Sequence, residues 1–474
     1  MSIIKKSGTF HREDQQDNPY VYVPFEVPRQ SQQIEVRLKF DIGNVIDLGL
    51  ADPRFTDFPA MEGFRGWSGG FRDRFVIREN SATPGYIPGP LYEGTWWVLL
   101  GLYRISAEGC KYQIEILIDE ETELTHLPLP ATKDEIQLSL EPGWYPGDLH
   151  SHTYHSDAWG SLEDLLAAAE SRGLSFLAVT DHNTTSHHPY LKAVSSPLLL
   201  IAGMELTTDF GHMNVFGAKD WIDFRFQCFE DIMAAVTCAH ALGGVCSVNH
   251  PKEGGPRWQF AFPEVSCMEV WQAPWANRNW ESLDWYQQLL TKGKRITLIG
   301  GSDRHQPGWP DRGPEALQIG SPTTWLYLED ASLSSVLKAL QNGWASVSES
   351  PQGPFLNLCY GSSKMGETVE HRPGVSVEAR VNGAKGNMLS WWTNKGLLFT
   401  QPLESDTCCI TFDLEGSETF IRAEVWAQGE PLTRRLEQVA TFINAGLAPE
   451  GLRLEQIKAH PYRLALSNPI YFKS

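Results

Sequence analysis

Between residues 147 and 352 the sequence alternates short apolar runs with segments that have apolar residues at helical spacing. Phe176–Val179 and Val245–Val248 have the length of buried strands, and Phe229–Leu242 has the pattern of a helix. Ser161 is a typical N-cap, and Gly173 is typical of the residue that ends a helix. This alternation predicts an α/β region with a parallel sheet or barrel, in which functional side chains follow the C-terminal ends of the strands.

The segments on both sides of this region are rich in strands instead. Tyr20–Val27 and Gln33–Phe40 precede it, and Val375–Val381 and Phe420–Trp426 follow it. Turn-rich stretches at 141–148 and 350–354 mark the two junctions. We therefore expect a β-rich domain over residues 1–146, an α/β domain over 147–352 and a second β-rich domain over 353–474. The outer two would be sandwich-like.

The acidic net charge of the chain limits the kinds of molecule that it is expected to bind. The chain has 39 Lys and Arg against 58 Asp and Glu, a net charge of −19. Such a surface repels phosphate backbones, so we expect a small-molecule substrate and no nucleic acid. No stretch reaches the roughly 20 apolar residues that span a bilayer, and the start lacks the apolar core of a signal peptide. We expect a cytoplasmic protein with reduced cysteines and no membrane partner, and its oligomeric state stays open.

Nine potential metal ligands stand at or after the predicted strand ends. His150 and His152 lie two residues apart, so both rings point to the same face of an extended chain. Glu205 ends a long apolar run, where a carboxylate without a cation would be costly. Any one ligand alone could be a turn or surface residue, but together they predict more than one divalent ion, with Asp181 supporting His182. The nine residues are His150, His152, Asp157, His182, Glu205, His212, His250, Asp303 and His305.

These motifs together resemble those of the PHP (polymerase and histidinol phosphatase) family. The resemblance rests on H-x-H at His150, D-H at Asp181, G-H at Gly211, N-H-P at Asn249 and D-x-H at Asp303. The stretch from residue 148 to residue 157 is similar to the CehA/McbA-like subgroup of metallohydrolases, and the ending at 466–472 resembles theirs. The resemblance implies a distorted seven-stranded (β/α) barrel that binds two or three divalent ions of manganese, iron or zinc.

The resemblance also implies how the ligands divide among the ions. The first ion would be held by His150, His152, Glu205 and Asp303. Glu205 would bridge to a second ion, which His212 and His250 complete. The third would be held by Asp157, His182 and His305. The family often has histidine at the position of Asp157.

The resemblance implies hydrolysis of a small-molecule phosphate ester by a metal-bridging hydroxide. Hydrolysis of a carbamate or carboxylic ester is an alternative, and so is a non-catalytic, metal-stabilised ligand-binding protein. Arg304 and Lys252 stand beside predicted ligands and are candidate catalytic residues that would bind the substrate phosphate. The alternative for Arg304 is a salt bridge directed away from the cavity.

Four tryptophans are crowded into one segment of this region: Trp271, Trp275, Trp280 and Trp285. One interpretation is an aromatic wall that receives an apolar leaving group. The other is packing between a helix and the barrel.

Overall fold

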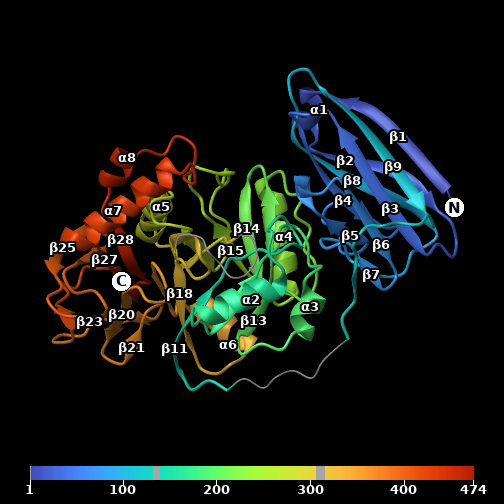
Figure 1. Ribbon diagram of the computed structural model, residues 1–474. Coiled ribbons are helices and arrows are strands. Elements are labelled where there is room, and N and C mark those ends of the chain that lie inside the picture. Colours follow the sequence, from blue (N-terminus) through green and yellow to red (C-terminus); the bar gives the residue numbers. More distant parts are fainter. Residues whose placement is uncertain (1, 132–138, 306–314, 474) are drawn as a thin grey trace.

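The computed structural model describes residues 2–131, 139–305 and 315–473. Figure 1 shows three parts in chain order, with a strand-rich N-terminal part in blue, a mixed part in green and a C-terminal part in orange and red. The two chain ends lie at opposite sides of the molecule. The protein is thus of mixed α/β class. None of the helices in the described residues is both long and apolar enough to cross a membrane.

Two antiparallel sheets form the N-terminal part. Its elements are β1 (Ser2–Phe10), α1 (Arg12–Asp17), β2 (Tyr20–Val27), β3 (Gln33–Phe40), β4 (Val45–Ala51), β5 (Phe64–Trp67), η1 (Gly69–Phe71), β6 (Arg74–Arg78), β7 (Ser81–Ala82), β8 (Gly94–Arg104), β9 (Cys110–Ile118) and β10 (Leu127–Pro128). One sheet has the order β1-β9-β3-β6-β7-β10 and the other β2-β8-β4-β5. Ile34, Leu48 and Trp96 belong to one buried core that both sheets share, which gives the sandwich its inner layer.

The four-stranded sheet is also buried on its second face. Trp67 and Leu99 of this sheet share a hydrophobic cluster with Met204, Met213 and Phe224 of the central part. Because this cluster is a second core between the two parts, the sandwich is fixed against the central part rather than tethered by a linker.

The central part has a mixed rather than a purely parallel sheet. Its strands are β11 (Gly143–Asp148), β12 (Phe176–Val179), β13 (Leu199–Thr208), β14 (Gly211–Phe216), β15 (Val245–Asn249), β16 (Cys267–Gln272), β17 (Thr297–Gly301), β18 (Thr323–Leu328) and β19 (Ala345–Ser348). The order is β17-β16-β15-β14-β13-β12-β11-β18-β19. β14 and β18 run antiparallel to their neighbours, so the parallel prediction was wrong for these two strands.

The reason lies in the connection between β13 and β14. Only Asp209 and Phe210 separate the two strands, and a two-residue connection allows a hairpin but no parallel crossover. At the far side of the sheet, the Thr324 hydroxyl accepts a hydrogen bond from Gly300 N at 2.9 Å and donates one to Gly300 O at 2.6 Å. These bonds bring β18 beside β17. Closure into a seven-stranded barrel remains a prediction.

The helices of the central part follow their sequence signals. They are α2 (Leu162–Ser171), α3 (His188–Ala193), α4 (Phe229–Ala241), α5 (Asn279–Thr291), η2 (Glu315–Leu317) and α6 (Leu333–Asn342). The Ser161 hydroxyl accepts a hydrogen bond from Asp164 N at 3.1 Å and so caps α2. Gly343 ends α6 with a φ of 72°, a conformation that glycine adopts without strain.

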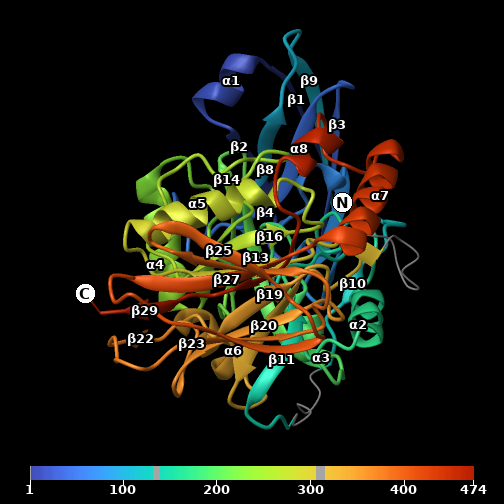
Figure 2. The ribbon, with the colours of Figure 1, turned by 90° about the vertical axis from the view of Figure 1, so that its left-hand side faces the viewer.

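The C-terminal part continues the central sheet. Its elements are β20 (Phe355–Tyr360), β21 (Ser363–Lys364), β22 (Thr368–Val369), β23 (Val377–Asn382), β24 (Met388–Thr393), β25 (Gly396–Pro402), β26 (Thr407–Phe412), β27 (Phe420–Trp426), α7 (Gly429–Asn444), α8 (Leu454–Lys458), β28 (Arg463–Ser467) and β29 (Ile470–Phe472). β19 pairs with β28, and β27, β24 and β25 follow. Figure 2 looks onto this end, with the strands in front and α7 beside them.

The side chain of Asn468 ties the C-terminal part to the central strands. Its Nδ2 donates to Leu298 O at 2.8 Å and to Ala345 O at 2.9 Å, and its Oδ1 accepts from Leu298 N at 2.7 Å. One sheet therefore continues across the predicted junction at residue 352.

Candidate metal centre

The candidate ligands gather where the central strands end. His150 and His152 follow β11, His250 follows β15, and Asp303 follows β17. Asp148, the last residue of β11, is a clamp at this edge. Its Oδ1 accepts from His150 N and from Ser302 N, each at 3.0 Å, and its Oδ2 accepts from Gly320 N at 2.7 Å. The buried aspartate thus holds the first and last ligand-bearing segments together.

Glu205 occupies the middle of the cluster. Its Oε2 lies 3.3 Å from His150 Nε2 and 2.9 Å from His182 Nδ1. Its Oε1 lies 3.1 Å from His212 Nδ1 and 3.3 Å from His250 Nε2. The two oxygens therefore face two different groups of histidines, which is the arrangement a bridging carboxylate needs.

In the part of the chain that the structure describes, four sets of ligand atoms lie within 4.8 Å of one another. Three of them correspond to the predicted ion sites, with His152 added to the third. The sets are His150, His152, Glu205 and Asp303; Glu205, His212 and His250; His152, Asp157, His182 and His305; and His150, His250 and Glu269.

Lone pairs in the first set point at one another. Since His150 Nδ1 lies 2.9 Å from Glu269 Oε1, it carries the proton, and Nε2 presents a lone pair. That atom lies 3.3 Å from both Glu205 Oε2 and Asp303 Oδ1. All three atoms are buried without a hydrogen-bond partner among the described residues. Ligands bound tetrahedrally at about 2.1 Å lie roughly 3.4 Å apart, so a divalent cation fits these atoms.

The third set shows the same pattern. His182 Nδ1 lies 2.6 Å from Thr207 Oγ1, and His305 Nδ1 lies 2.9 Å from Asp303 O, so each Nε2 is left as an acceptor. The two Nε2 atoms are 3.5 Å apart, and that of His305 lies 3.1 Å from Asp157 Oδ1. Three acceptors that converge in this way also fit a cation.

The electrostatics couple the carboxylates of the cluster to its histidines. Burial opposes protonation of His150, His182 and His305, but the nearby carboxylates outweigh it, raise the pKa of His150 and His182 and raise that of His305 to about 9, so metal ions would displace protons from these imidazoles. Burial, together with His305 and His182, lowers the pKa of His152 to about 4, so this imidazole is neutral. Burial opposes ionisation of Glu205 and Asp303, but the nearby His150 outweighs it and holds both pKa values well below the usual range. Neutral imidazoles and ionised carboxylates are the forms that bind metal ions.

Three supporting residues lay outside the sequence prediction. Glu269 of β16 binds His150, Gln272 Nε2 donates to Asp303 Oδ2 at 2.8 Å, and Asn249 Nδ2 donates to Glu205 Oε1 at 2.9 Å. Glu269 carried a signal, since it is a charge inside a short apolar run, as Glu205 is. The two amides carried none.

The predicted support of His182 by Asp181 was wrong. Asp181 accepts from Thr153 N at 2.8 Å and from Ser156 Oγ at 2.7 Å, and so it braces the loop that leads to Asp157. The partner of His182 is Thr207, one strand further on.

Two ligand residues have a left-handed backbone. His250 has a φ of 28° and Asp303 a φ of 51°. This conformation costs side-chain-bearing residues on the order of 1–3 kcal/mol. The surrounding fold holds both residues there, and both side chains face Glu205 or its histidines.

A pocket of about 470 Å³ opens onto the third set, and Asp157, His182 and His212 line it. The side chains of Asp157 and His305 are 43% and 33% exposed, whereas that of His150 is fully buried. The third set is therefore the most exposed part of the cluster, and the pocket gives a substrate access to it.

Neither predicted catalytic residue lines this pocket. Lys252 is buried, and its ammonium group donates to Gln272 O at 3.1 Å and to Asn279 Oδ1 at 2.7 Å. Burial lowers its pKa to about 7. Arg304 is 1% exposed, and its carbonyl accepts from His152 N at 3.2 Å. The positions suit both residues to supporting the ligand loops rather than to touching a substrate.

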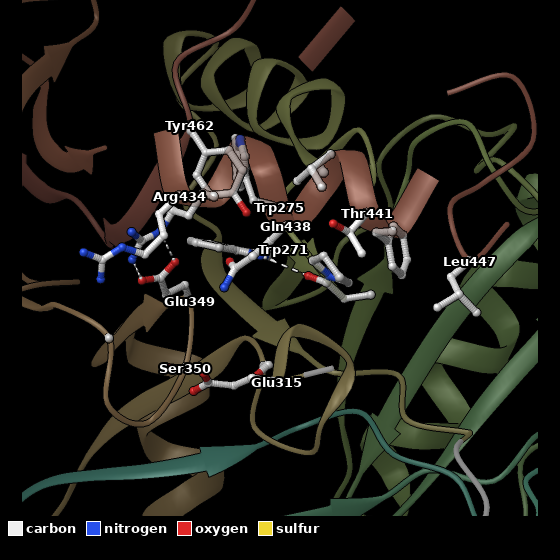
Figure 3. A pocket seen from close by; sticks show the side chains of 18 of the residues that line it. Trp271, Trp275, Glu315, Glu349, Ser350, Arg434, Gln438, Thr441, Leu447 and Tyr462 are labelled. Carbon is white, nitrogen blue, oxygen red and sulfur yellow. Dashed lines mark hydrogen bonds and ion pairs between the residues drawn. The ribbon is translucent and has the colours of Figure 1, made fainter. Parts of the chain in front are cut away.

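The predicted aromatic wall was wrong for this pocket, because none of the four tryptophans lines it. Trp271 and Trp275 line a separate cavity of about 660 Å³ between the central part and α7, where they lie near Tyr462 (Figure 3). Trp280 stacks on His460 with ring centres 4.7 Å apart, and Trp285 packs against a hydrophobic core. The packing interpretation holds.

Comparisons with known proteins agree with the ligand geometry. Residues 148–247 match the model of the PHP domain, a stretch that contains six of the nine ligands. The chain is 28% identical, over 150 residues, to the probable phosphatase YcdX of Escherichia coli O127:H6, and the match covers 26% of this chain and 59% of that protein. The chain thus spans less than two thirds of this curated relative.

A solved structure is similar over a longer stretch. It is a two-domain protein from Bacteroides vulgatus ATCC 8482, described as containing a predicted PHP-like metal-dependent phosphoesterase. The TM-score is 0.36 at 17% sequence identity, and the match covers 71% of this chain and 99% of that one.

Proposed function

Because the central part of this chain contains a PHP domain, we propose that the protein is a metal-dependent phosphoesterase that hydrolyses a small-molecule phosphate ester. The observation that carries the proposal is Glu205, whose two oxygens face separate histidine groups amid buried, unpaired acceptors. The similarity to a probable phosphatase supports a phosphate ester as the substrate.

The ligand sets assign the ions as follows. The first would be held by His150, His152, Glu205 and Asp303, the second by Glu205, His212 and His250, and the third by Asp157, His182 and His305. Imidazole and carboxylate donors suit manganese, iron or zinc. When bound, such ions supply an activated water and positive charge beside the phosphate oxygens.

Two neighbouring residues, Glu269 and Gln272, hold the candidate ligands in the orientation that binds an ion. Glu269 holds the proton of His150 on Nδ1, and therefore Nε2 always faces the cluster. Gln272 holds Asp303 through its second carboxylate oxygen, which leaves Oδ1 as a ligand. The phosphate would enter past Asp157 and His305, the two most exposed members of the set, while the alcohol part of the ester stays in the pocket.

The test is hydrolysis by protein loaded with manganese, iron or zinc. We expect phosphate esters such as 4-nitrophenyl phosphate or bis(4-nitrophenyl) phosphate to be hydrolysed in at least one metal form. Asp303→Asn should reduce the rate at least about 100-fold, since it weakens a ligand of the first ion. The matched control Asp57→Asn, at an exposed position in the N-terminal sandwich, should not.

Two other outcomes would overturn the proposal. Hydrolysis of 4-nitrophenyl methylcarbamate or acetate, with no phosphate ester turned over, would point to a carbamate or carboxylic ester hydrolase. Metal binding with no hydrolysis of any ester would point to a metal-stabilised binding protein.

A further inference from the structure

The N-terminal sandwich forms one wall of the pocket beside the metal cluster. Tyr20, Asp47, Trp67, Phe71 and Tyr103 line it from the sheet β2-β8-β4-β5 and from η1. Asp209 and Phe210, in the turn between β13 and β14, line it from the central part. Five of these seven residues are aromatic, and the other two are carboxylates beyond those of the metal cluster.

Asp47 is the unexpected residue on this wall. Along β4 it shares a face with Gly49 and Ala51, because side chains alternate along a strand. That face packs toward the central part, with Ala51 in the shared hydrophobic cluster. A charged side chain is unusual on a face that packs two parts of a protein together, because burial of an unpaired carboxylate is costly.

The neighbours of Asp47 leave space for its carboxylate. Its cross-strand partner on β8 is Gly101. A β-carbon at Gly101 would lie 2.9 Å from the Trp67 ring and 3.0 Å from Asp47 Oδ2, closer than such atoms normally approach. Any larger residue at Gly101 would thus displace the carboxylate or the ring that line the pocket.

The side chains of Asp47 and Asp209 have no hydrogen bond or salt bridge within the described residues. Burial and then the charge of Asp209 raise the pKa of Asp47 to about 7, and burial raises that of Asp209 to about 6. A cation beside buried carboxylates such as these would stabilise their charged forms.

Asp47 and Asp209 differ from the carboxylates of the metal cluster. Neither Asp47 nor Asp209 belongs to any set of three ligand atoms within 4.8 Å in the described structure. Tyr20, Trp67, Phe71, Tyr103 and Phe210 share the pocket with these two carboxylates, and aromatic rings with carboxylates are surroundings in which proteins bind organic ammonium groups.

We propose that this wall binds an ammonium group on the alcohol part of the phosphate ester, with Asp47 and Asp209 as its counter-charges. The inference rests on the proposed function and names its substrate class, a phosphate ester of an amino alcohol. The phosphate meets Asp157 and His182, and the ammonium group meets Asp47, at two ends of one pocket of about 470 Å³. That volume suits a small molecule of this kind.

The first test compares a charged substrate with a neutral one of the same shape. Phosphocholine and 3,3-dimethylbutyl phosphate form such a pair of monoesters, and their 4-nitrophenyl diesters form the matching pair of diesters. The measured quantity is the ratio of the two kcat/KM values at pH 8, where Asp47 is ionised. We expect a ratio of about 10 or more, the effect of roughly 1.4 kcal/mol from ammonium recognition.

Variants show whether the wall causes the preference. Asp47→Asn keeps the shape and removes the charge, so the ratio should fall to about 1, and Asp209→Asn should lower it in part. Asp57→Asn, a charge change of the same kind outside the pocket, should keep the wild-type ratio. A ratio near 1 in the wild-type protein, or an unchanged ratio in Asp47→Asn, would overturn the inference.

A binding measurement separates this inference from the proposed function. Choline has the ammonium group but no phosphate, and its binding can be followed by calorimetry without turnover. We expect choline to bind, 3,3-dimethylbutanol to bind at least about 10-fold more weakly, and Asp47→Asn to remove the difference. Choline binding without ester hydrolysis would contradict only the proposed function. Ester hydrolysis with neither choline binding nor a charge preference would contradict only the ammonium site.

Discussion

Glu205 shows how a single residue connects sequence to chemistry here. It is a carboxylate at the end of an apolar run, and the structure surrounds it with imidazoles on both oxygens. A buried carboxylate in such a place is stable only with positive charge nearby. Metal ions or protonated histidines supply this charge: despite burial, the carboxylates raise the pKa of His150 and raise that of His305 to about 9. Because Nδ1 of each ring is held by a neighbouring oxygen, Nε2 of each ring faces the carboxylates, where a metal ion can replace its proton.

Removal of the support behind His150 tests this reasoning. In Glu269→Ala the Nδ1 proton loses its acceptor, and so the imidazole is free to change tautomer. We expect metal affinity to fall about 10- to 100-fold, as is typical when a hydrogen bond behind a ligand is lost. The measurement is metal retained after dialysis against a graded chelator series. Glu264→Ala, at an exposed position five residues earlier, is the control. Equal retention in both variants would contradict the role of Glu269.

The charge of Asp47 predicts a pH-dependent stability difference. Burial and Asp209 raise its folded-state pKa to about 7, so its ionisation penalty is absent below pH 4 and grows as the pH rises toward 7. Asp47→Asn should therefore raise the free energy of unfolding by roughly 4 kcal/mol at pH 8, from about three pKa units, and by little near pH 4. Urea unfolding of both proteins across this range checks it. A stability difference that stays constant with pH would contradict a raised pKa of Asp47 in the folded protein.

Residue type and strand-end position predict nine candidate ligands, and the structure brings all nine into sets of ligand atoms that lie within 4.8 Å of one another. The direction in which each side chain points was harder to predict. Lys252 and Arg304 are neighbours of ligands in the chain, yet neither lines the pocket. The wall at Asp47 lies about 100 residues before the first ligand in sequence, and only the packing of two parts brings it to the cluster.

At the scale of elements, helices were more predictable than strands. α2 begins directly after the predicted N-cap Ser161, and α4 covers Phe229–Ala241, so both lie where the sequence predicts them. β14 and β18 were not predicted as antiparallel strands, because direction depends on connections rather than on apolar content. β1, with two adjacent lysines followed by small residues, lacks a strong strand pattern and owes its place to its pairing with β9.

A pair of hydrogen bonds links the N-terminal sandwich to the loop that carries a member of the third ligand set. The guanidinium of Arg72, beside η1, donates to Ser156 O at 2.8 Å and to Tyr154 O. These two carbonyls lie in the loop that carries Asp157. The sandwich thus helps to position a ligand that belongs to the central part.

Arg72→Ala should therefore affect one ion selectively. With the loop released, we expect the third ion to be lost at chelator concentrations that leave the other two bound, because their ligands do not contact Arg72. Metal-to-protein ratios after stepwise chelation measure this. Arg74→Ala, an exposed arginine on β6, is the matched control. Simultaneous loss of all ions in Arg72→Ala would contradict the selective role.

At the scale of the whole molecule, the three parts are joined more closely than the sequence suggests. The four-stranded sheet shares a core with β13 and β14, and the central sheet runs on into the C-terminal strands. The alternation of strand-rich and mixed segments predicts where the kind of structure changes along the chain, but periodicity does not reveal which faces pack together. That packing supplies half of the pocket wall, and so the sandwich belongs to the candidate site as well as to the fold.

The most direct test of the central claim is anomalous diffraction from crystals of metal-loaded protein, recorded at the manganese, iron and zinc absorption edges. The account predicts at least two anomalous peaks beside Glu205, one on the side of each carboxylate oxygen, at about 2.0–2.2 Å from their ligand atoms. A single peak away from Glu205, or none in crystals whose solution sample binds metal, would contradict it.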